Sequence, residues 1–149
     1  FIKNVEGKAT EMQKENSVCV HVRRGDSLQK ANYFGVLSPG YYVKALDYLR
    51  RNTGKFKVYF FSDDMDWVKE NIRIKEDHEF VSGIRSINKI EDVEGMTNCR
   101  HHIIANSSFS WWAAWLNPNK EKTIIAPEKW FNSNQYNPDD VIPDNWIKI

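Results

Sequence analysis

Two adjacent arginines follow the first β-branched apolar run of the chain. The segment HVRRGD (21–26) begins within the run Val18–Val22. Guanidinium groups bind phosphate through paired hydrogen bonds, and two of them at the end of a strand are costly to hold without an anion. The pattern predicts an anion site at Arg23 and Arg24, with Asp26 holding one arginine in place. The alternative is a salt-bridged turn in which Asp26 only neutralises an arginine.

A second polar group follows the run Lys57–Phe61 and contains Ser62, Asp63, Asp64 and Asp66. Carboxylates in the first turn of a helix favour the positive end of its dipole, so helix capping is one interpretation. A carboxylate also accepts hydrogen bonds from a nucleobase edge such as that of guanine. A third interpretation is a divalent cation between Asp64 and Asp66, because hard cations prefer oxygen ligands.

A third polar group opens an apolar helical pattern and comprises Asn106, Ser107, Ser108, Phe109 and Ser110. Capping a helix requires only one small polar residue, and this segment has four. Hydroxyls and free N–H groups at a helix N-terminus bind anions well. The segment therefore predicts a second anion-binding element.

Several familiar sites have no counterpart in the sequence. It contains no Walker loop, no G-x-G-x-x-G and no H-E-x-x-H. Cys19 and Cys99 form no metal-ligand pattern, and His101 and His102 lack zinc spacing; we expect these histidines to pack at a strand edge. We therefore expect neither a resident metal nor a cofactor, with a cation between Asp64 and Asp66 as the alternative.

Short apolar runs alternate with helical patterns along the chain and must position these groups. Runs of this length are typical of buried strands in a parallel sheet. We expect strands at Val18–Val22, Lys57–Phe61, His78–Ser82, His102–Ala105 and Thr123–Ala126. Helices are expected after Ser38-Pro39, after Asp63 or Asp64, after Asn88, and from Ser107 to Leu116. The predicted fold is α/β, an open parallel sheet whose ligands lie beyond the carboxyl ends of the strands.

The helix expected from Ser107 to Leu116 is apolar on nearly every side. Such a helix is normally buried on most sides. We therefore expect Trp111, Trp112 and Trp115 to belong to the core rather than to a ligand platform.

Composition and charge exclude several classes of protein. The formal charge of +1 lacks the basic excess of nucleic-acid binders, and no apolar run approaches the roughly 20 residues of a membrane helix. A length of 149 residues indicates one domain. Because residues 5–15 are polar, we expect residues 1–16 to be a linker or residual helix and residues 17–149 to be the domain, cut from a longer protein.

These motifs, in this order, resemble those of one enzyme family. The segments are HVRRGD, FFSDD followed by DWVKENI, HHIIANSSFSWWAAWL, IIAPEKWF and IPDNWIKI. They resemble the alpha-1,2-fucosyltransferases, glycosyltransferase family 11, from about Val18 to Ile149. The Gly-rich opening segment of that family is absent, so the chain resembles the C-terminal, donor-binding half. Ala113-Ala114 stands where the family often has Gly-Ala, an exchange of one small residue for another.

The resemblance implies a Rossmann-like domain, one half of a GT-B-type glycosyltransferase. Such an enzyme transfers L-fucose from GDP-fucose to the 2-hydroxyl of a galactose-containing glycan, with inversion and without a metal. The isolated half is expected to be poorly active, because the missing half would hold the acceptor. We expect a bacterial cytoplasmic enzyme, with membrane association of the full-length protein, or residence in the Golgi lumen, as alternatives.

The resemblance also implies roles for individual residues. Arg23 would contact the β-phosphate of the donor, and Arg24 would support the loop or the fucose. The serine-rich helix start (106–110) would hold the pyrophosphate, and His21 would lie near the ribose and guanine with the group at 62–64. Asp26 beside two cations would be a poor base and a better orienter of an arginine.

Two other functions stay open at this stage. One is a metal-dependent nucleotide-sugar transferase built on Asp64 and Asp66. The other is a module that binds a nucleotide or glycan without catalysis.

Overall fold

A computed structural model describes residues 2–25, 35–81 and 89–149 of the chain. Within these residues, six strands form one parallel sheet in the order β3-β2-β1-β4-β5-β6. The strands are β1 (Ser17–Val22), β2 (Lys57–Ser62), β3 (His78–Phe80), β4 (His101–Ile103), β5 (Ile124–Ala126) and β6 (Ile147–Lys148). This is the strand order of doubly wound dinucleotide-binding folds, and it confirms the predicted Rossmann-like architecture.

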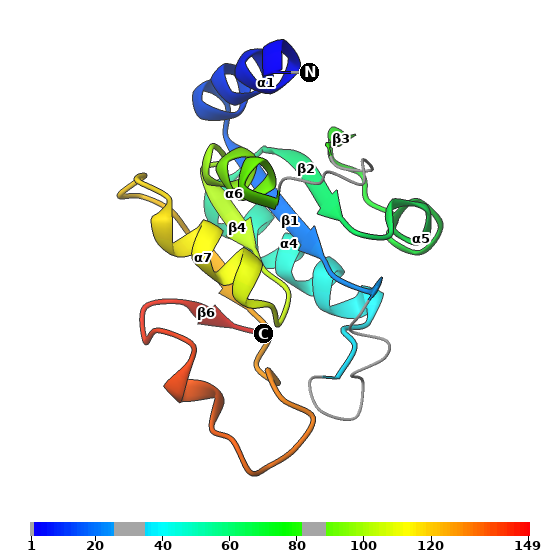
Figure 1. Ribbon diagram of the computed structural model, residues 1–149, viewed down its shortest axis with the longest axis vertical. Coiled ribbons are helices and arrows are strands. Elements are labelled where there is room, and N and C mark those ends of the chain that lie inside the picture. Colours follow the sequence, from blue (N-terminus) through cyan, green and yellow to red (C-terminus); the bar gives the residue numbers. More distant parts are fainter. Residues whose placement is uncertain (1, 26–34, 82–88) are drawn as a thin grey trace.

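Helices cover both faces of the sheet (Figure 1). They are α1 (Ile2–Lys14), α4 (Pro39–Thr53), α5 (Met65–Asn71), α6 (Lys89–Thr97), α7 (Ser108–Leu116) and a short 3-10 helix, η1 (Pro138–Asp140). Valines 18, 20 and 22 of β1 pack with α4 and α5 on one face. Cys19 packs with α1, α6 and α7 on the other, since successive side chains of a strand point to opposite faces.

The C-terminal segment adds a third apolar cluster at the β5 side of the sheet. Trp130, Ile142 and Trp146 pack there against Ile104 and Ala114. The hydroxyl of Tyr41 in α4 donates to the carbonyl of Ile104 at 2.7 Å, which joins α4 to the residue after β4. The apolar cluster holds the segment after β5 beside the carboxyl end of the sheet.

The point where the strand order reverses lies between β1 and β4. The chain moves outward from β1 to β3 and then returns to start β4 on the other side of β1. In open α/β sheets, ligands bind in the crevice outside the carboxyl ends of the strands at such a switch point. In this chain Arg23 follows β1 there, and the serine-headed helix α7 follows β4.

Some predicted elements differ from the observed ones at their limits. Strand β4 begins at His101 and ends at Ile103, whereas His102–Ala105 was predicted. β6 was not predicted, because a two-residue strand leaves no periodic signal. Residues 1–16, expected as a linker or residual helix, contain α1, which packs on the domain through the buried Met12.

Ser82 is the predicted end of the strand that begins at His78, and Asn88 precedes a predicted helix. Both residues lie outside the described part of the chain.

The prediction that α7 is buried on most sides is wrong. Its small residues Ser110, Ala113 and Ala114 face inward, whereas Trp112 and Trp115 are 52% and 51% exposed. A helix in the outer layer of an α/β fold packs on one side only. In α7 the small inward residues allow the helix to approach the sheet closely. The prediction of a core position therefore fails for Trp112 and Trp115.

The expected edge position of two histidines is also wrong. His101 and His102 lie on β4, which pairs with β1 on one side and β5 on the other. Both are buried, with exposures of 4% and 1%.

In the described part of the chain, no helix has the length and apolar character needed to cross a membrane.

Candidate functional site

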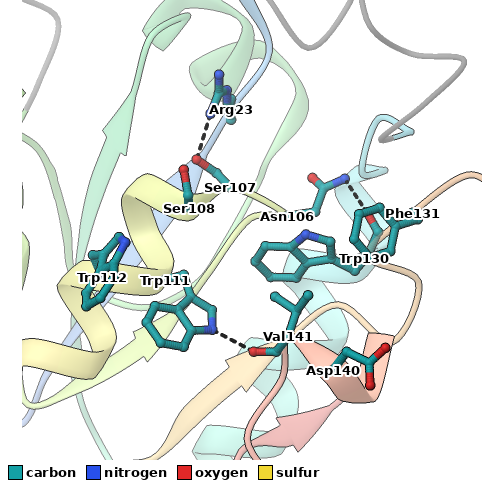
Figure 2. A pocket seen from close by; sticks show the side chains of 10 residues that line it. All are labelled: Arg23, Asn106, Ser107, Ser108, Trp111, Trp112, Trp130, Phe131, Asp140 and Val141. Atoms are coloured by element: carbon teal, nitrogen blue, oxygen red, sulfur yellow. Dashed lines mark hydrogen bonds between the residues drawn. The ribbon is translucent and has the colours of Figure 1, made fainter. Parts of the chain in front are cut away.

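Arg23 and the N-terminus of α7 meet at the switch point. The Nη1 of Arg23 donates a hydrogen bond to Ser107 Oγ at 2.8 Å (Figure 2). Ser107 is the N-cap of α7, and the same oxygen accepts from the N–H of Phe109 at 3.3 Å. A guanidinium and the positive, N-terminal end of a helix therefore lie side by side, which concentrates positive potential in the crevice.

The two adjacent arginines point in different directions. The guanidinium carbon of Arg24 lies 3.8 Å from the centre of the Trp67 ring, in α5. Its Nε is buried and has no hydrogen-bond partner among the described residues. Arg24 is thus held over α5 by a cation–π contact, whereas Arg23 reaches across to α7.

Asp63 fastens the turn after β1 to the end of β2. Its two carboxylate oxygens accept from the backbone N–H groups of Arg24 at 2.9 Å and Gly25 at 2.8 Å. A Cβ on residue 25 would lie 2.6 Å from Asp63 Oδ2, so a larger residue there would push this carboxylate oxygen from its place. The carboxylate of Asp63 therefore shapes the arginine turn.

Asp64 has the capping role that was one of its three interpretations. Its Oδ1 accepts from the N–H of Trp67 at 3.1 Å, and its own N–H donates to Ser62 Oγ at 3.0 Å. Asp66 is exposed in the first turn of α5. No group of three or more His, Cys, Asp or Glu that could hold a metal ion occurs among residues 2–25, 35–81 and 89–149.

His21 is a buried, neutral histidine at the end of β1. Its side chain is 7% exposed, and its ring lies 5.6 Å from that of Phe109. Burial, together with the charge of Arg23, lowers the pKa of His21 to about 3. Its Nδ1 is buried without a hydrogen-bond partner among the described residues, so this nitrogen can take a partner from a ligand.

Asn106 and Ser110 connect the start of α7 to neighbouring segments through hydrogen bonds to backbone carbonyls. Asn106 Nδ2 donates to the carbonyls of Trp130 at 3.1 Å and Gly35 at 3.3 Å. Ser110 Oγ donates to the carbonyls of Ala105 and Ser107. These side chains connect β4 with the segments before α4 and after β5, which fixes the direction of α7.

A pocket of about 600 Å³ opens from Arg23 toward the β5 side of the sheet. It is lined by Arg23, Asn106, Ser107, Ser108, Trp111, Trp112, Trp130, Phe131, Asp140 and Val141 (Figure 2). Of the predicted site residues, the first four line this pocket, and His21 at the end of β1 packs against Phe109 in the first turn of α7. Ser62, Asp63 and Asp64 lie at the end of β2, on the other side of β1 from β4. Asp26 lies outside the described residues.

The aromatic part of the lining was missed in the sequence. The sequence pattern places Trp111 and Trp112 in the core, and the motif IIAPEKWF predicts no role for its aromatic residues Trp130 and Phe131. The available signal was the pair of adjacent aromatic doublets, Trp111-Trp112 and Trp130-Phe131, each following a strand end.

Comparison with known proteins gives consistent matches. An alpha-1,2-colitosyltransferase of Escherichia coli is 37% identical over 142 residues, which cover 90% of this chain and 48% of that protein. The O-antigen biosynthesis glycosyltransferase WbnK of Escherichia coli is 33% identical over 140 residues, 92% of this chain and 46% of its own length. The human galactoside alpha-(1,2)-fucosyltransferase 1 is 34% identical over 103 residues, 66% of this chain and 28% of that protein.

The chain spans about half the length of the two bacterial relatives. The family described as Glycosyl transferase family 11 matches residues 1–149, and its match includes both the arginine turn after β1 and the serine-headed helix after β4. By this match over its whole length, the chain belongs to glycosyl transferase family 11.

Proposed function

We propose that residues 17–149 are the donor-binding domain of a fucosyltransferase. The enzyme would transfer L-fucose from GDP-fucose to the 2-hydroxyl of a galactoside acceptor, with inversion at the anomeric carbon. The names of the relatives, a colitosyltransferase and galactoside fucosyltransferases, support a transferase of this class. The Rossmann-like strand order supports a nucleotide-bearing donor.

The observation that carries the proposal is the hydrogen bond between Arg23 and Ser107 at the switch point. It joins two elements that would bind phosphate by different means. Arg23 offers charged donors in a planar fork, and α7 offers the positive end of its dipole and the N–H of Ser108, the first residue of the helix, while Ser107 caps the N–H of Phe109. A diphosphate between them would receive both sets of donors.

This arrangement suits the chemistry of fucosyl transfer. The bond between the anomeric carbon and the β-phosphate oxygen breaks, and GDP leaves with the electron pair. The acceptor oxygen bonds to the opposite face of that carbon, and its proton passes to a general base or to solvent water. Negative charge grows on the β-phosphate as the bond breaks, so donors fixed beside it stabilise the transition state more than the ground state. In the full-length enzyme, Arg23→Ala should lower turnover about 100-fold or more.

The remaining predicted residues take supporting roles in this proposal. His21 would meet the nucleotide through its unpartnered Nδ1. Asp63 and Arg24 would keep the arginine turn in shape, and Ser62 and Asp64 would lie toward the nucleoside. Asp26 remains proposed as an orienter of an arginine.

Calorimetric titration of this chain tests the proposal. GDP and GDP-fucose should bind, UDP-galactose should not, and chelation of divalent cations by EDTA should leave binding unchanged. Binding that disappears with EDTA and returns with Mn²⁺ would instead favour a metal-dependent transferase built on Asp64 and Asp66. A chain that binds no nucleotide at all would reject the proposed function.

A further inference from the structure

The pocket beyond Arg23 contains a wall that a diphosphate would not use. Figure 2 shows Arg23 and Ser107 toward one end, Asp140 at the other, and the rings of Trp111 and Trp130 between them. Together with Trp112 and Phe131, these two rings form what we call the aromatic wall.

The aromatic wall is held rigidly from behind. Trp111 Nε1 donates to the carbonyl of Val141 at 2.8 Å, and its ring lies 5.5 Å from that of Trp146. Trp130 is 4% exposed, and its carbonyl accepts from Asn106. Trp112 contacts Trp111 edge to face at 5.0 Å, yet 52% of its side chain is exposed. Trp112 thus presents an exposed indole at the pocket, in contact with the anchored ring of Trp111.

A carboxylate stands opposite the cationic end of the pocket. Asp140 closes η1, and its N–H donates to the carbonyl of Asn137 at 3.2 Å. No other described residue engages its exposed carboxylate. The neighbouring Asp139 pairs with Lys148, so the two adjacent carboxylates differ in their availability.

These features match the chemistry of a sugar ring. A pyranose has a face of C–H groups, which packs on the negative face of an aromatic ring, and an edge of hydroxyls that donate to carboxylates. Small-ligand pockets combine apolar walls with a few placed polar groups in this way.

We propose that the aromatic wall and Asp140 form a subsite for the acceptor galactoside, with Trp112 as the stacking surface. The proposal rests on the proposed function, because it takes Arg23 and Ser107 as the place of the leaving diphosphate. It assigns acceptor binding to this half of the protein, which the sequence alone left to the missing half.

The strand order places the aromatic wall on the side of the switch point where the transferred sugar, rather than the nucleoside, would lie. The pocket lining includes no residue of β2 or α5. From the diphosphate position between β1 and β4, Ser62, Asp63 and Asp64 lie toward β2, and the aromatic wall lies toward β5. With the nucleoside over β2, the transferred sugar and its acceptor extend toward β5.

Trp115 supplies a matched control. It lies on the same helix and is 51% exposed, close to the 52% of Trp112, but it does not line the pocket. It stacks on Trp111 at 5.2 Å, so its removal also takes an aromatic contact from α7. A loss specific to the pocket is therefore separable from a loss of helix packing.

The experiment titrates the chain, saturated with GDP, with N-acetyllactosamine and follows the disaccharide by saturation-transfer NMR. Trp112→Ala should weaken disaccharide binding roughly tenfold or more, as expected for loss of a stacking contact, and Trp112→Phe should restore most of it. Asp140→Asn should also weaken it, whereas Trp115→Ala should not. The affinity for GDP, measured by calorimetry, should stay within about twofold in all four variants.

Three results would overturn the subsite. They are no disaccharide binding by the unmodified chain at millimolar concentration, equal losses in Trp112→Ala and Trp115→Ala, or self-association that both tryptophan substitutions abolish. The last result would make this face a contact between copies. Failure of GDP to bind would instead reject the proposed function, so the two failures are distinguishable.

Discussion

Arg23 and Ser107 are 84 residues apart in the chain, yet the guanidinium of one donates to the hydroxyl of the other at 2.8 Å. The contact exists because β1 and β4 are neighbours in the sheet although two other strands separate them in sequence. Each strand delivers its following residues to the same crevice. The candidate anion site is therefore a product of the strand order.

Replacing Arg23 tests its part in anion binding. Arg23→Ala should weaken GDP binding roughly 10- to 100-fold, because a hydrogen bond to a charged group contributes about 1.5–3 kcal/mol. Arg51→Ala, on the exposed side of α4, removes the same charge elsewhere and should leave the affinity unchanged. Calorimetry on both variants makes the comparison, and equal affinities would refute the role of Arg23.

Replacing Gly25 tests the clamp made by Asp63. In Gly25→Ala the new Cβ would displace Asp63 Oδ2 from its N–H partners, and we expect a loss of about 1–2 kcal/mol in the free energy of unfolding. GDP binding should weaken as well, since the turn carries Arg23.

Gly40→Ala is the control for that substitution. Its Cβ would meet Ser38 Oγ at an ordinary 3.5 Å inside helix α4, so it should stabilise the fold by about 0.5–1 kcal/mol. Urea unfolding measures both variants. A stable Gly25→Ala chain with unchanged GDP affinity would show that the clamp does not matter.

Stability should fall as the pH drops below about 6.5, because buried histidines are neutral in the folded chain. Burial, with Lys122 as a smaller cause, lowers the pKa of His102 from 6.5 to about 3, and its Nε2 accepts from Asn117 at 2.8 Å. Between these two pH values the unfolded chain binds a proton that the folded chain does not. Each such histidine then costs about 1.4 kcal/mol per pH unit.

Unfolding at several pH values checks this dependence. His102→Gln should flatten the slope of the unfolding free energy against pH, while His78→Gln, at an exposed position, should keep it. A slope that is the same in His102→Gln and in the unmodified chain would contradict the assignment.

Asn106 should matter for stability through its two carbonyl partners. Asn106→Asp places a carboxylate against the carbonyls of Gly35 and Trp130, and we expect the free energy of unfolding to drop by about 2–3 kcal/mol. Asn52→Asp, which alters an exposed amide bonded to Tyr48 within α4, should cost less than about 1 kcal/mol. Thermal melts of the two variants provide the test, and similar melting temperatures would count against a structural role for Asn106.

Local hydrophobic patterns predicted the strands that are long enough to have a clear composition and period. β1 and β2 are β-branched or aromatic runs buried along nearly their whole length, so their period and composition suffice. β6 has two residues and forms only because β5 offers a free edge there. The sequence does not reveal that edge without the rest of the sheet.

Site residues whose chemical type implies a ligand could be predicted from the sequence. Contacts between side chains that depend on how the strands pair could not. Arg23 and Ser107 were identified from chemistry at strand ends. The clamp of Asp63 on Gly25 depends on the pairing of Val22 with Ser62, which no local pattern encodes. Likewise, apolar composition could not show that Trp112 lacks a covering neighbour, because burial depends on which elements pack against α7.

A crystal structure of this chain with GDP tests the central claim most directly. We expect oxygens of the diphosphate within hydrogen-bonding distance of the Arg23 guanidinium and of the Ser108 N–H, in the crevice between β1 and β4. A diphosphate bound away from both groups would contradict the account.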